Sequence, residues 1–190
     1  MTDSATSRSR ISALLAEADA ERERFLAAVD AVDPELETTP GIVGDWSARD
    51  LVAHVAWWCD HGADALELAA SGRGDQFAYE GSQTDAMNAD ALPGWRAVSM
   101  AAARAEEERA FQRLRALVAG LDAALLDHRL GNGDTAEAVI RYDGPGHYAE
   151  HALQVRAWFG DASEPDEDDD DALPPAPGAE VPVKSTSTEP

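Results

Sequence analysis

Two histidines four residues apart, His147 and His151, are the residues of this sequence whose type and spacing best suit chemistry. On an α-helix, residues i and i+4 lie one above the other on the same face. Two imidazoles placed in this way can share one divalent cation, with nitrogen–metal distances of about 2.0–2.1 Å for zinc. Gly144 and Pro145 provide a suitable helix start, because a proline in the first turn loses no hydrogen bond. A third ligand must come from elsewhere, and the best candidate is His54.

The three histidines together are a more specific signal than any one of them. All three lie on segments predicted to be helices that face one another, and His54 lies on an apolar face. Buried polar groups need partners, and a shared metal ion would supply one. Three imidazoles suit zinc, nickel, copper or iron, and of these we expect zinc or nickel. His61 and His128 have no comparable support and are predicted to lie at the surface or rim.

The segment from His147 to His151 also matches the H-x-x-E-H pattern of inverted zinc proteases. Those enzymes take a further glutamate ligand from a helix well downstream, whereas the sequence after Phe159 is predicted to be disordered. Glu150 would also lie off the face that the two histidines share. The pattern therefore does not indicate a protease.

Apolar residues at helical spacing predict four helices. They cover about residues 7–32, 48–70, 92–121 and 145–160. A polar stretch rich in Gly, Asp and Ser, residues 71–90, is predicted to be a long irregular crossover, and residues 135–142 are either a short helix or an extended piece. Four helices with one long crossover predict an all-α four-helix bundle, in which sites are built from side chains that project inward from facing helices.

The helix at residues 48–70 has a well-formed start. Ser47 can cap it, and Asp50 follows three residues later, as in a capping box. Trp46 and Leu51 occupy the positions of a hydrophobic staple. Asp50 also precedes His54 by one turn, so its carboxylate is a candidate to orient that imidazole by a hydrogen bond. The capping role is the simpler of the two.

Four aromatic residues are candidates to line a substrate pocket: Trp57 and Trp58 on this helix, and Phe77 and Tyr79 in the crossover. Long loops in a compact domain often line or cover a site. The alternative for the two tryptophans is an ordinary place in the core. Cys59 is predicted to be a small buried residue and not a nucleophile, because nothing nearby in sequence would activate it.

The chain has 190 residues and a formal net charge of −22, and its length suits one domain with a proper core. Residues 164–190 hold nine acidic residues and six prolines, a composition typical of disorder. We therefore expect a bundle domain at residues 1–163 and a disordered acidic tail. Removing the tail's charge of −8 from −22 leaves −14 on the domain, which argues against non-specific binding to nucleic acid or anionic membranes.

Location and assembly follow from simpler patterns. No apolar run approaches the roughly 18 residues of a membrane helix, and the N-terminus lacks the apolar core of a signal peptide. A cytoplasmic protein is the default expectation. The single cysteine excludes an intramolecular disulfide. An apolar stripe left exposed on the first or third helix would favour a homodimer, and the pattern alone does not decide this.

Residues 44–55, Gly-Asp-Trp-Ser-Ala-Arg-Asp-Leu-Val-Ala-His-Val, resemble the second-helix signature of the DinB-like superfamily. His147-x-x-x-His151 followed by Gln154 resembles that superfamily's fourth-helix motif, and residues 84–88 resemble the stretch before its third helix. The superfamily includes the N-terminal domain of mycothiol-dependent maleylpyruvate isomerase. The fourth-helix motif is most similar to the branch that contains the colibactin self-resistance protein.

This resemblance covers about residues 7–160 and implies a four-helix bundle with His54, His147 and His151 as metal ligands. Members of this superfamily include thiol-dependent transferases and isomerases, and hydrolases that disarm reactive natural products. The resemblance therefore implies a metal-dependent enzyme that attacks a small electrophile with a low-molecular-weight thiol, such as mycothiol, or with water. Two alternatives stay open. One is a protein that only sequesters a toxic small molecule, and the other is a bundle that keeps the triad for stability or acts through a partner of its acidic tail.

Overall fold

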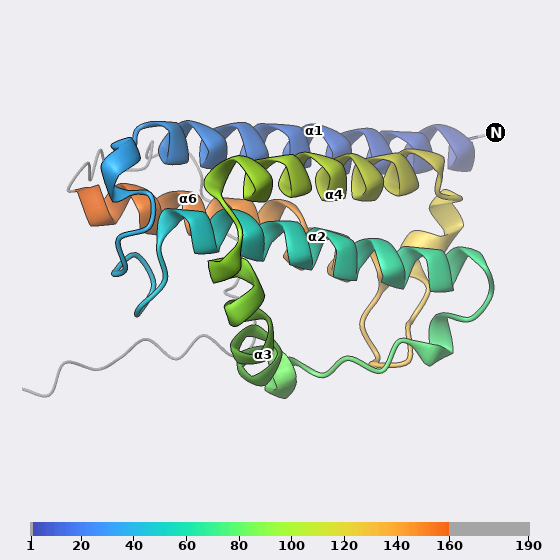
Figure 1. Ribbon diagram of the computed structural model, residues 1–190. Coiled ribbons are helices and arrows are strands. Elements are labelled where there is room, and N and C mark those ends of the chain that lie inside the picture. Colours follow the sequence, from blue (N-terminus) through green and yellow to red (C-terminus); the bar gives the residue numbers. More distant parts are fainter. Residues whose placement is uncertain (1, 160–190) are drawn as a thin grey trace, which may run out of the picture.

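Four long helices pack around an apolar core in the computed structural model of the chain, which describes the backbone of residues 2–159 and side chains from residue 8 onward. They are α1 (Thr2–Asp30), α2 (Ala48–Ala70), α4 (Met100–Gly120) and α6 (Pro145–Phe159). Helix α2 packs chiefly against α4, and α1 packs chiefly against α6. Figure 1 shows α2 and α4 running in one direction and α1 and α6 in the other. The all-α four-helix bundle is confirmed.

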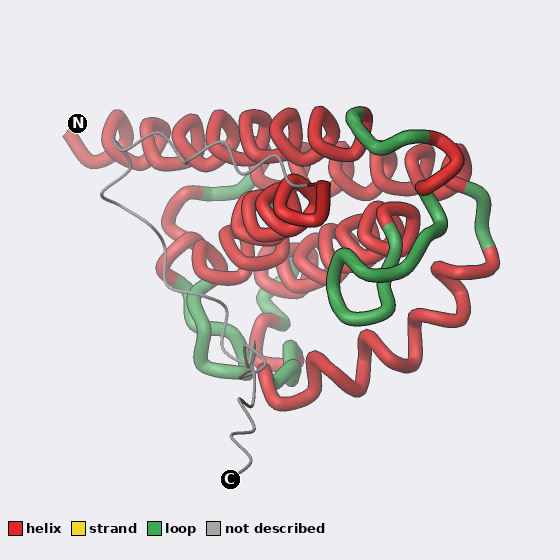
Figure 2. Tube along the Cα trace, turned by 90° about the vertical axis from the view of Figure 1, so that its left-hand side faces the viewer, coloured by secondary structure: helices red, strands yellow, loops and turns green. Residues whose placement is uncertain are grey.

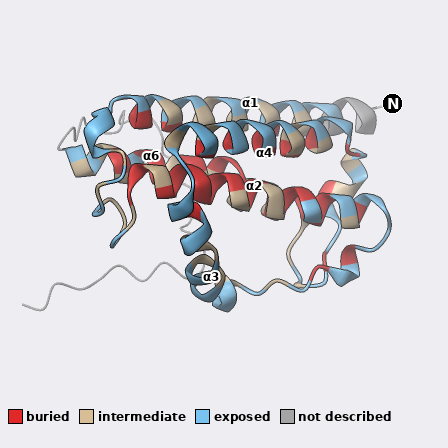
Figure 3. Ribbon diagram, viewed as in Figure 1, coloured by how far each residue is buried: buried red, intermediate tan, exposed pale blue. Residues whose placement is uncertain are grey.

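Each long helix buries a stripe of apolar side chains against its neighbours (Figure 3). On α1 the stripe includes Leu14, Phe25 and Val29, whose spacing places them on one helical face. Helix α2 is more enclosed, and every residue from Leu51 to Ala56 is buried. A polar group on this part of α2 is therefore surrounded by protein and needs a partner there.

The start of α2 has the predicted capping box. The hydroxyl of Ser47 accepts a hydrogen bond from the backbone N–H of Asp50 at 3.3 Å, and Oδ2 of Asp50 accepts one from the backbone N–H of Ser47 at 3.0 Å. These bonds satisfy N–H groups that the first turn of a helix leaves unpaired. The observed bounds of α2, Ala48 and Ala70, equal the predicted ones.

The crossover between α2 and α4 differs from the prediction. Helix α3 (Thr84–Ala97) begins inside the stretch that the sequence predicts to be irregular, so that prediction is wrong over its last residues. The crossover also contains the 3₁₀ helices η2 (Gly74–Gln76) and η3 (Gly81–Gln83). Figures 1 and 2 show α3 outside the four-helix bundle. Its only buried residue is Trp95, so α3 has no apolar stripe by which a sequence pattern could reveal it.

The prediction of a single helix over residues 92–121 is also wrong, because α3 and α4 are separate helices. Val98 between them has an extended backbone, with φ −97° and ψ 156°. Ser99 then caps α4, since its hydroxyl accepts a hydrogen bond from the backbone N–H of Ala102 at 3.2 Å. A serine cap offers the backbone an alternative to a continuous helix.

The remaining elements are short. They are the 3₁₀ helices η1 (Pro34–Leu36) and η4 (Ala123–Asp127) and the helix α5 (Ala136–Asp143). Helix α5 decides between the two alternatives for residues 135–142 in favour of a helix. Gly144 joins α5 to α6 where a Cβ atom would lie only 2.7 Å from the carbonyl oxygen of Ile140, so a glycine permits this tight junction.

Two expectations concern the membrane and the tail. None of the helices within residues 2–159 is long and apolar enough to cross a membrane. The predicted disordered tail, residues 164–190, lies outside the described residues.

Four polar side chains, one from each long helix, are joined inside the bundle. Arg22 of α1 donates from Nε and Nη2 to the carboxylate of Glu107 of α4, at 2.7 and 2.8 Å. Tyr148 of α6 donates its hydroxyl to the same carboxylate at 2.6 Å. Cys59 of α2 donates its thiol to the oxygen of Tyr148 at 3.4 Å. Glu107 is 1% exposed, so its charge depends on these partners.

Replacement of Glu107 by alanine is expected to lower the free energy of unfolding by about 3 kcal/mol, because Arg22 and Tyr148 lose their shared partner. Glu108→Ala is the matched control. Glu108 also bonds Arg22, but its side chain is 54% exposed, and its loss should cost about 0–1 kcal/mol. Urea unfolding followed by circular dichroism measures both variants. Equal losses for the two would contradict a central role for Glu107.

Candidate metal centre

The structure brings the three predicted histidines together. His54 comes from α2, and His147 and His151 come from α6. One ring nitrogen of each lies within 4.8 Å of the other two. The Nε2 atoms of His54 and His147 are 3.1 Å apart. Two nitrogens bound to one tetrahedral zinc ion at about 2.0–2.1 Å lie about 3.3 Å apart, so this pair has the spacing of two ligands of one metal ion.

Hydrogen bonds fix the orientation of two of the rings. Nδ1 of His147 lies 2.7 Å from the carbonyl oxygen of Tyr142, and Nδ1 of His151 lies 2.6 Å from Oε1 of Gln154. The amide nitrogen of Gln154 donates to Glu150 at 3.2 Å, which supports this orientation of the amide. Since oxygen acceptors face both Nδ1 atoms, each Nδ1 carries the proton. Each Nε2 then presents the lone pair that metal binding requires.

Burial keeps the three imidazoles neutral. It lowers the pKa of His54 well below its usual value, with further lowering by His151 and His147. Burial, with the neighbouring His151, lowers the pKa of His147 to about 3. Burial also lowers the pKa of His151. Neutral imidazole is the form that binds metal ions.

Two buried ring nitrogens of the cluster have no hydrogen-bond partner among the described residues: Nε2 of His151 and Nδ1 of His54. A buried polar atom without a partner is costly. A metal ion held by the three Nε2 atoms would satisfy that of His151. Without a metal ion, the contact between Nε2 of His54 and Nε2 of His147 is a hydrogen bond from one ring to the other, and its length also suits two ligands of one ion. The residues present therefore fit a bound metal ion.

Three tryptophan rings pack around the cluster. The rings of Trp46 and Trp95 lie 4.8 and 5.1 Å from the ring of His54, measured between centroids. Trp58 stacks on His147 at 5.4 Å with an interplanar angle of 20°. Sequence reasoning did not place Trp46 and Trp95 at the site. The staple position of Trp46, just before α2, is a sequence feature that could have placed this ring near His54. No such feature exists for Trp95, which reaches the site only because α3 is a separate helix.

The four predicted pocket residues divide between two places. Trp58 contacts the histidine cluster. Trp57, Phe77 and Tyr79 instead contact His61, with ring centroids 5.8, 5.2 and 4.8 Å from its ring. Trp58 also contacts His61, at 4.9 Å, so one aromatic wall extends from the cluster to this fourth histidine. The role of these residues in lining a substrate pocket stays a prediction.

Asp50 does not orient His54 in this structure. Its carboxylate accepts the hydrogen bond from Ser47 and forms ion pairs with Arg49 at 3.1 Å and Arg96 at 3.6 Å. Nδ1 of His54, the atom that Asp50 would have to reach, has no partner. The capping role is confirmed, and the orienting role has no contact to support it, because the cap and the arginines occupy the carboxylate.

The other sequence candidates are as follows. His128 is exposed, as predicted. Cys59 is completely buried, and burial raises the pKa of its thiol, which therefore stays protonated and unreactive. His61 is at the rim, but sequence reasoning missed its partner, the buried carboxylate of Asp143 at 2.7 Å. No local sequence pattern could predict this pair, because His61 and Asp143 are far apart in the sequence.

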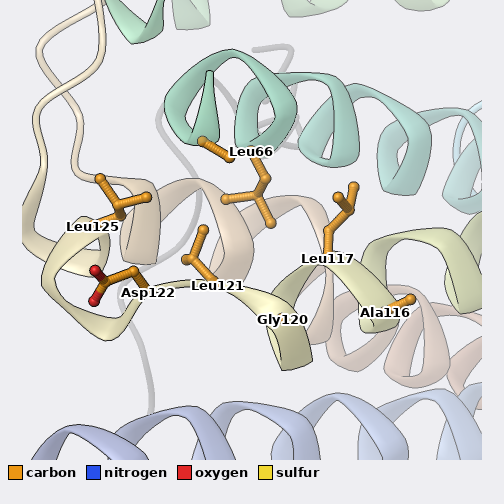
Figure 4. Close-up of a pocket in the computed structure, with 8 residues that line it drawn as sticks. Leu66, Ala116, Leu117, Gly120, Leu121, Asp122 and Leu125 are labelled. Atoms are coloured by element: carbon orange, nitrogen blue, oxygen red, sulfur yellow. The ribbon is translucent and has the colours of Figure 1, made fainter. Parts of the chain in front are cut away.

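A separate pocket of about 340 Å³ lies at the far end of α2 and α4. Figure 4 shows the side chains of Leu66, Leu117, Leu121 and Leu125 around it. Leu66 follows His54 by twelve residues in α2, which is about 18 Å along a helix at 1.5 Å per residue. The pocket is therefore not part of the histidine site, and its lining holds no group of metal ligands.

A helical bundle with three inward-facing histidines on two helices defines a class of protein, small bundles with a candidate site for one metal ion. The chain belongs to the DinB superfamily, whose family model matches residues 17–158. This confirms the resemblance seen in the sequence.

Among solved structures, the chain is similar to an uncharacterised protein from Escherichia coli UTI89. The two share 18% sequence identity, and the match covers 82% of this chain and 95% of that chain with a TM-score of 0.68. At this identity the likeness concerns the fold alone. A comparison with curated proteins gave no significant match.

The variant Gln154→Leu is expected to bind zinc about 10–100-fold more weakly, because Nδ1 of His151 loses the acceptor that fixes its proton. Leu153→Ala is the control, since this neighbouring side chain is 58% exposed and its removal should leave the affinity unchanged. Competition with a fluorescent zinc chelator measures both. If Gln154→Leu binds zinc as tightly as the parent, the bond to Gln154 does not orient His151 for a metal ion.

Proposed function

We propose that this protein is a small metal-dependent enzyme that acts on a small electrophilic molecule, by thiol transfer or by hydrolysis. The observation that carries the proposal is the convergence of three neutral imidazoles, of which the protein holds two in the ligand tautomer. Three protein ligands leave an open position on a metal ion, as in catalytic rather than structural sites. Zinc or nickel suits the all-nitrogen donor set.

A bound metal ion would supply a Lewis acid that brings the pKa of a coordinated water or thiol toward neutrality. The chain's own residues position and isolate that chemistry. The carbonyl of Tyr142 and the amide of Gln154 hold two ligand rings in place. The indoles of Trp46, Trp58 and Trp95 pack around the cluster, and electrostatic interactions are stronger in such apolar surroundings. In thiol transfer the co-reactant is a low-molecular-weight thiol such as mycothiol.

A second candidate function is stoichiometric binding, in which the bundle sequesters a toxic small molecule without converting it. The aromatic wall favours this alternative. The rings of Trp57, Trp58, Phe77 and Tyr79 lie within contact of His61 or of one another. Aromatic rings with a few polar groups are typical of small-molecule sites. Metal content and turnover separate the two functions.

The purified protein is expected to contain about one equivalent of zinc or nickel, since one cluster offers one set of three ligands. The double variant His147→Ala, His151→Ala should contain almost none. The matched control is His61→Ala, His128→Ala, which removes two imidazoles from outside the cluster and should keep the metal. Inductively coupled plasma mass spectrometry measures all three. Absence of metal from the parent, even after addition of zinc or nickel, would refute the enzymatic proposal.

The metal-loaded parent is expected to accelerate the attack of a thiol on 1-chloro-2,4-dinitrobenzene or the hydrolysis of 4-nitrophenyl acetate. The double variant that lacks His147 and His151 should lose the part of this acceleration that depends on the metal ion, because no metal ion activates the nucleophile. Absorbance follows both reactions. A metal-loaded parent that binds such electrophiles without converting them would favour sequestration over catalysis.

A further inference from the structure

His61 and Asp143 form a pair that shares no atom with the histidine cluster. Nδ1 of His61 lies 2.7 Å from Oδ2 of Asp143. Asp143 is completely buried at the end of α5, whereas the side chain of His61 on α2 is 14% exposed. Burial raises the pKa of Asp143 to about 6, against the effect of the hydrogen bond from His61. At neutral pH the carboxylate is therefore mostly ionised.

The pairing determines which nitrogen of His61 is free. An ionised carboxylate only accepts hydrogen bonds, so Nδ1 of His61 carries the proton and Nε2 carries the lone pair. Nε2 has no hydrogen-bond partner among the described residues, and it is not among the buried atoms without a partner. Nε2 therefore has some contact with solvent, in keeping with the 14% exposure of the side chain. A buried aspartate orients the histidine of serine hydrolases in the same way.

The surrounding structure is shaped to hold this pair. A Cβ atom at Gly62, the next residue in α2, would lie 2.9 Å from Cβ of Asp143. Only a residue without a side chain lets α5 come this close, so the glycine makes the contact between His61 and Asp143 possible. The rings of four aromatic residues enclose the imidazole and leave it few other orientations: Trp57, Trp58, Phe77 and Tyr79.

We propose that His61 is a second reactive centre of this protein, a base and nucleophile that Asp143 holds in its reactive tautomer. Its reactivity toward small electrophiles does not require a metal ion. In turnover, where the inference rests on the proposed function, Nε2 takes the proton that a thiol or water releases as its sulfur or oxygen bonds to the electrophilic carbon. The imidazolium then returns that proton to the atom that leaves this carbon.

Diethyl pyrocarbonate, a small acylating electrophile, tests the reactivity directly. Nε2 attacks a carbonyl carbon, the bond from this carbon to the bridging oxygen breaks with release of ethyl carbonate, and the proton on Nδ1 passes to Asp143. Peptide mass mapping gives the rate at His61, with the exposed His128 in the same sample as reference. In Asp143→Asn the rate at His61 should fall at least about tenfold, because the amide can donate to Nδ1 and favour the unreactive tautomer.

Asp134→Asn is the matched control. This substitution also removes one negative charge close to Asp143. Asp134 affects Asp143 only through space, because the side-chain hydrogen bonds of Asp134 are with Asn132 and Tyr142. The rate at His61 should stay that of the parent. Thermal unfolding checks that both variants are folded.

The ring ¹⁵N chemical shifts of His61 give a second readout that needs no variant. The parent should show a protonated Nδ1 and a free Nε2. A protonated Nε2 in the parent, an unreactive His61, or a rate that Asp143→Asn leaves unchanged relative to His128 would each overturn the proposal. None of these measurements involves a metal ion, so a failure here is distinct from a failure of the proposed metal centre.

Discussion

The rest of the bundle depends on the buried carboxylate of Glu107. It accepts hydrogen bonds from Arg22 and Tyr148, and Cys59 joins the same chain of bonds, so all four long helices meet through one charge. A buried charge is strongly unfavourable once it loses its partners. Apolar packing alone tolerates small rotations and shifts of a helix. We infer that this carboxylate selects one register of α6 among the packings that the apolar stripes allow.

The register of α6 matters because the residue that reaches the carboxylate is next to a residue of the site. Tyr148 points into the core, where the rings of Phe25 and Phe111 contact it at 5.6 and 5.9 Å. His147 precedes it and faces α2, together with His151 one turn later. Successive residues of a helix are about 100° apart around the axis. A shift of α6 by one residue would therefore remove both histidines from His54.

Sequence reasoning predicted the local features and missed the distant ones. The spacing of His147 and His151 and the capping box of α2 are set within four residues, so the pattern alone reveals them. Helix α3 was missed because only Trp95 is buried, and the tryptophan's approach to His54 was missed with it. The pair of His61 and Asp143 joins residues 82 positions apart. Its aspartate ends α5, whose helical nature the sequence left open.

The two histidine arrangements follow from one contact between helices. His54, Trp58 and His61 are spaced by four and three residues, so they lie along one face of α2. The chain opposite this face passes from Asp143 to His147 through the tight junction between α5 and α6.

The imidazoles on this face of α2 have different partners, and these give them different chemistry. Burial among other imidazoles keeps His54 and His147 neutral and turns their Nε2 atoms toward each other. The carboxylate of Asp143 instead pairs with Nδ1 of His61 and leaves Nε2 without a partner among the described residues. Trp58 contacts both His61 and His147, and so lies between the candidate metal site and the proposed base.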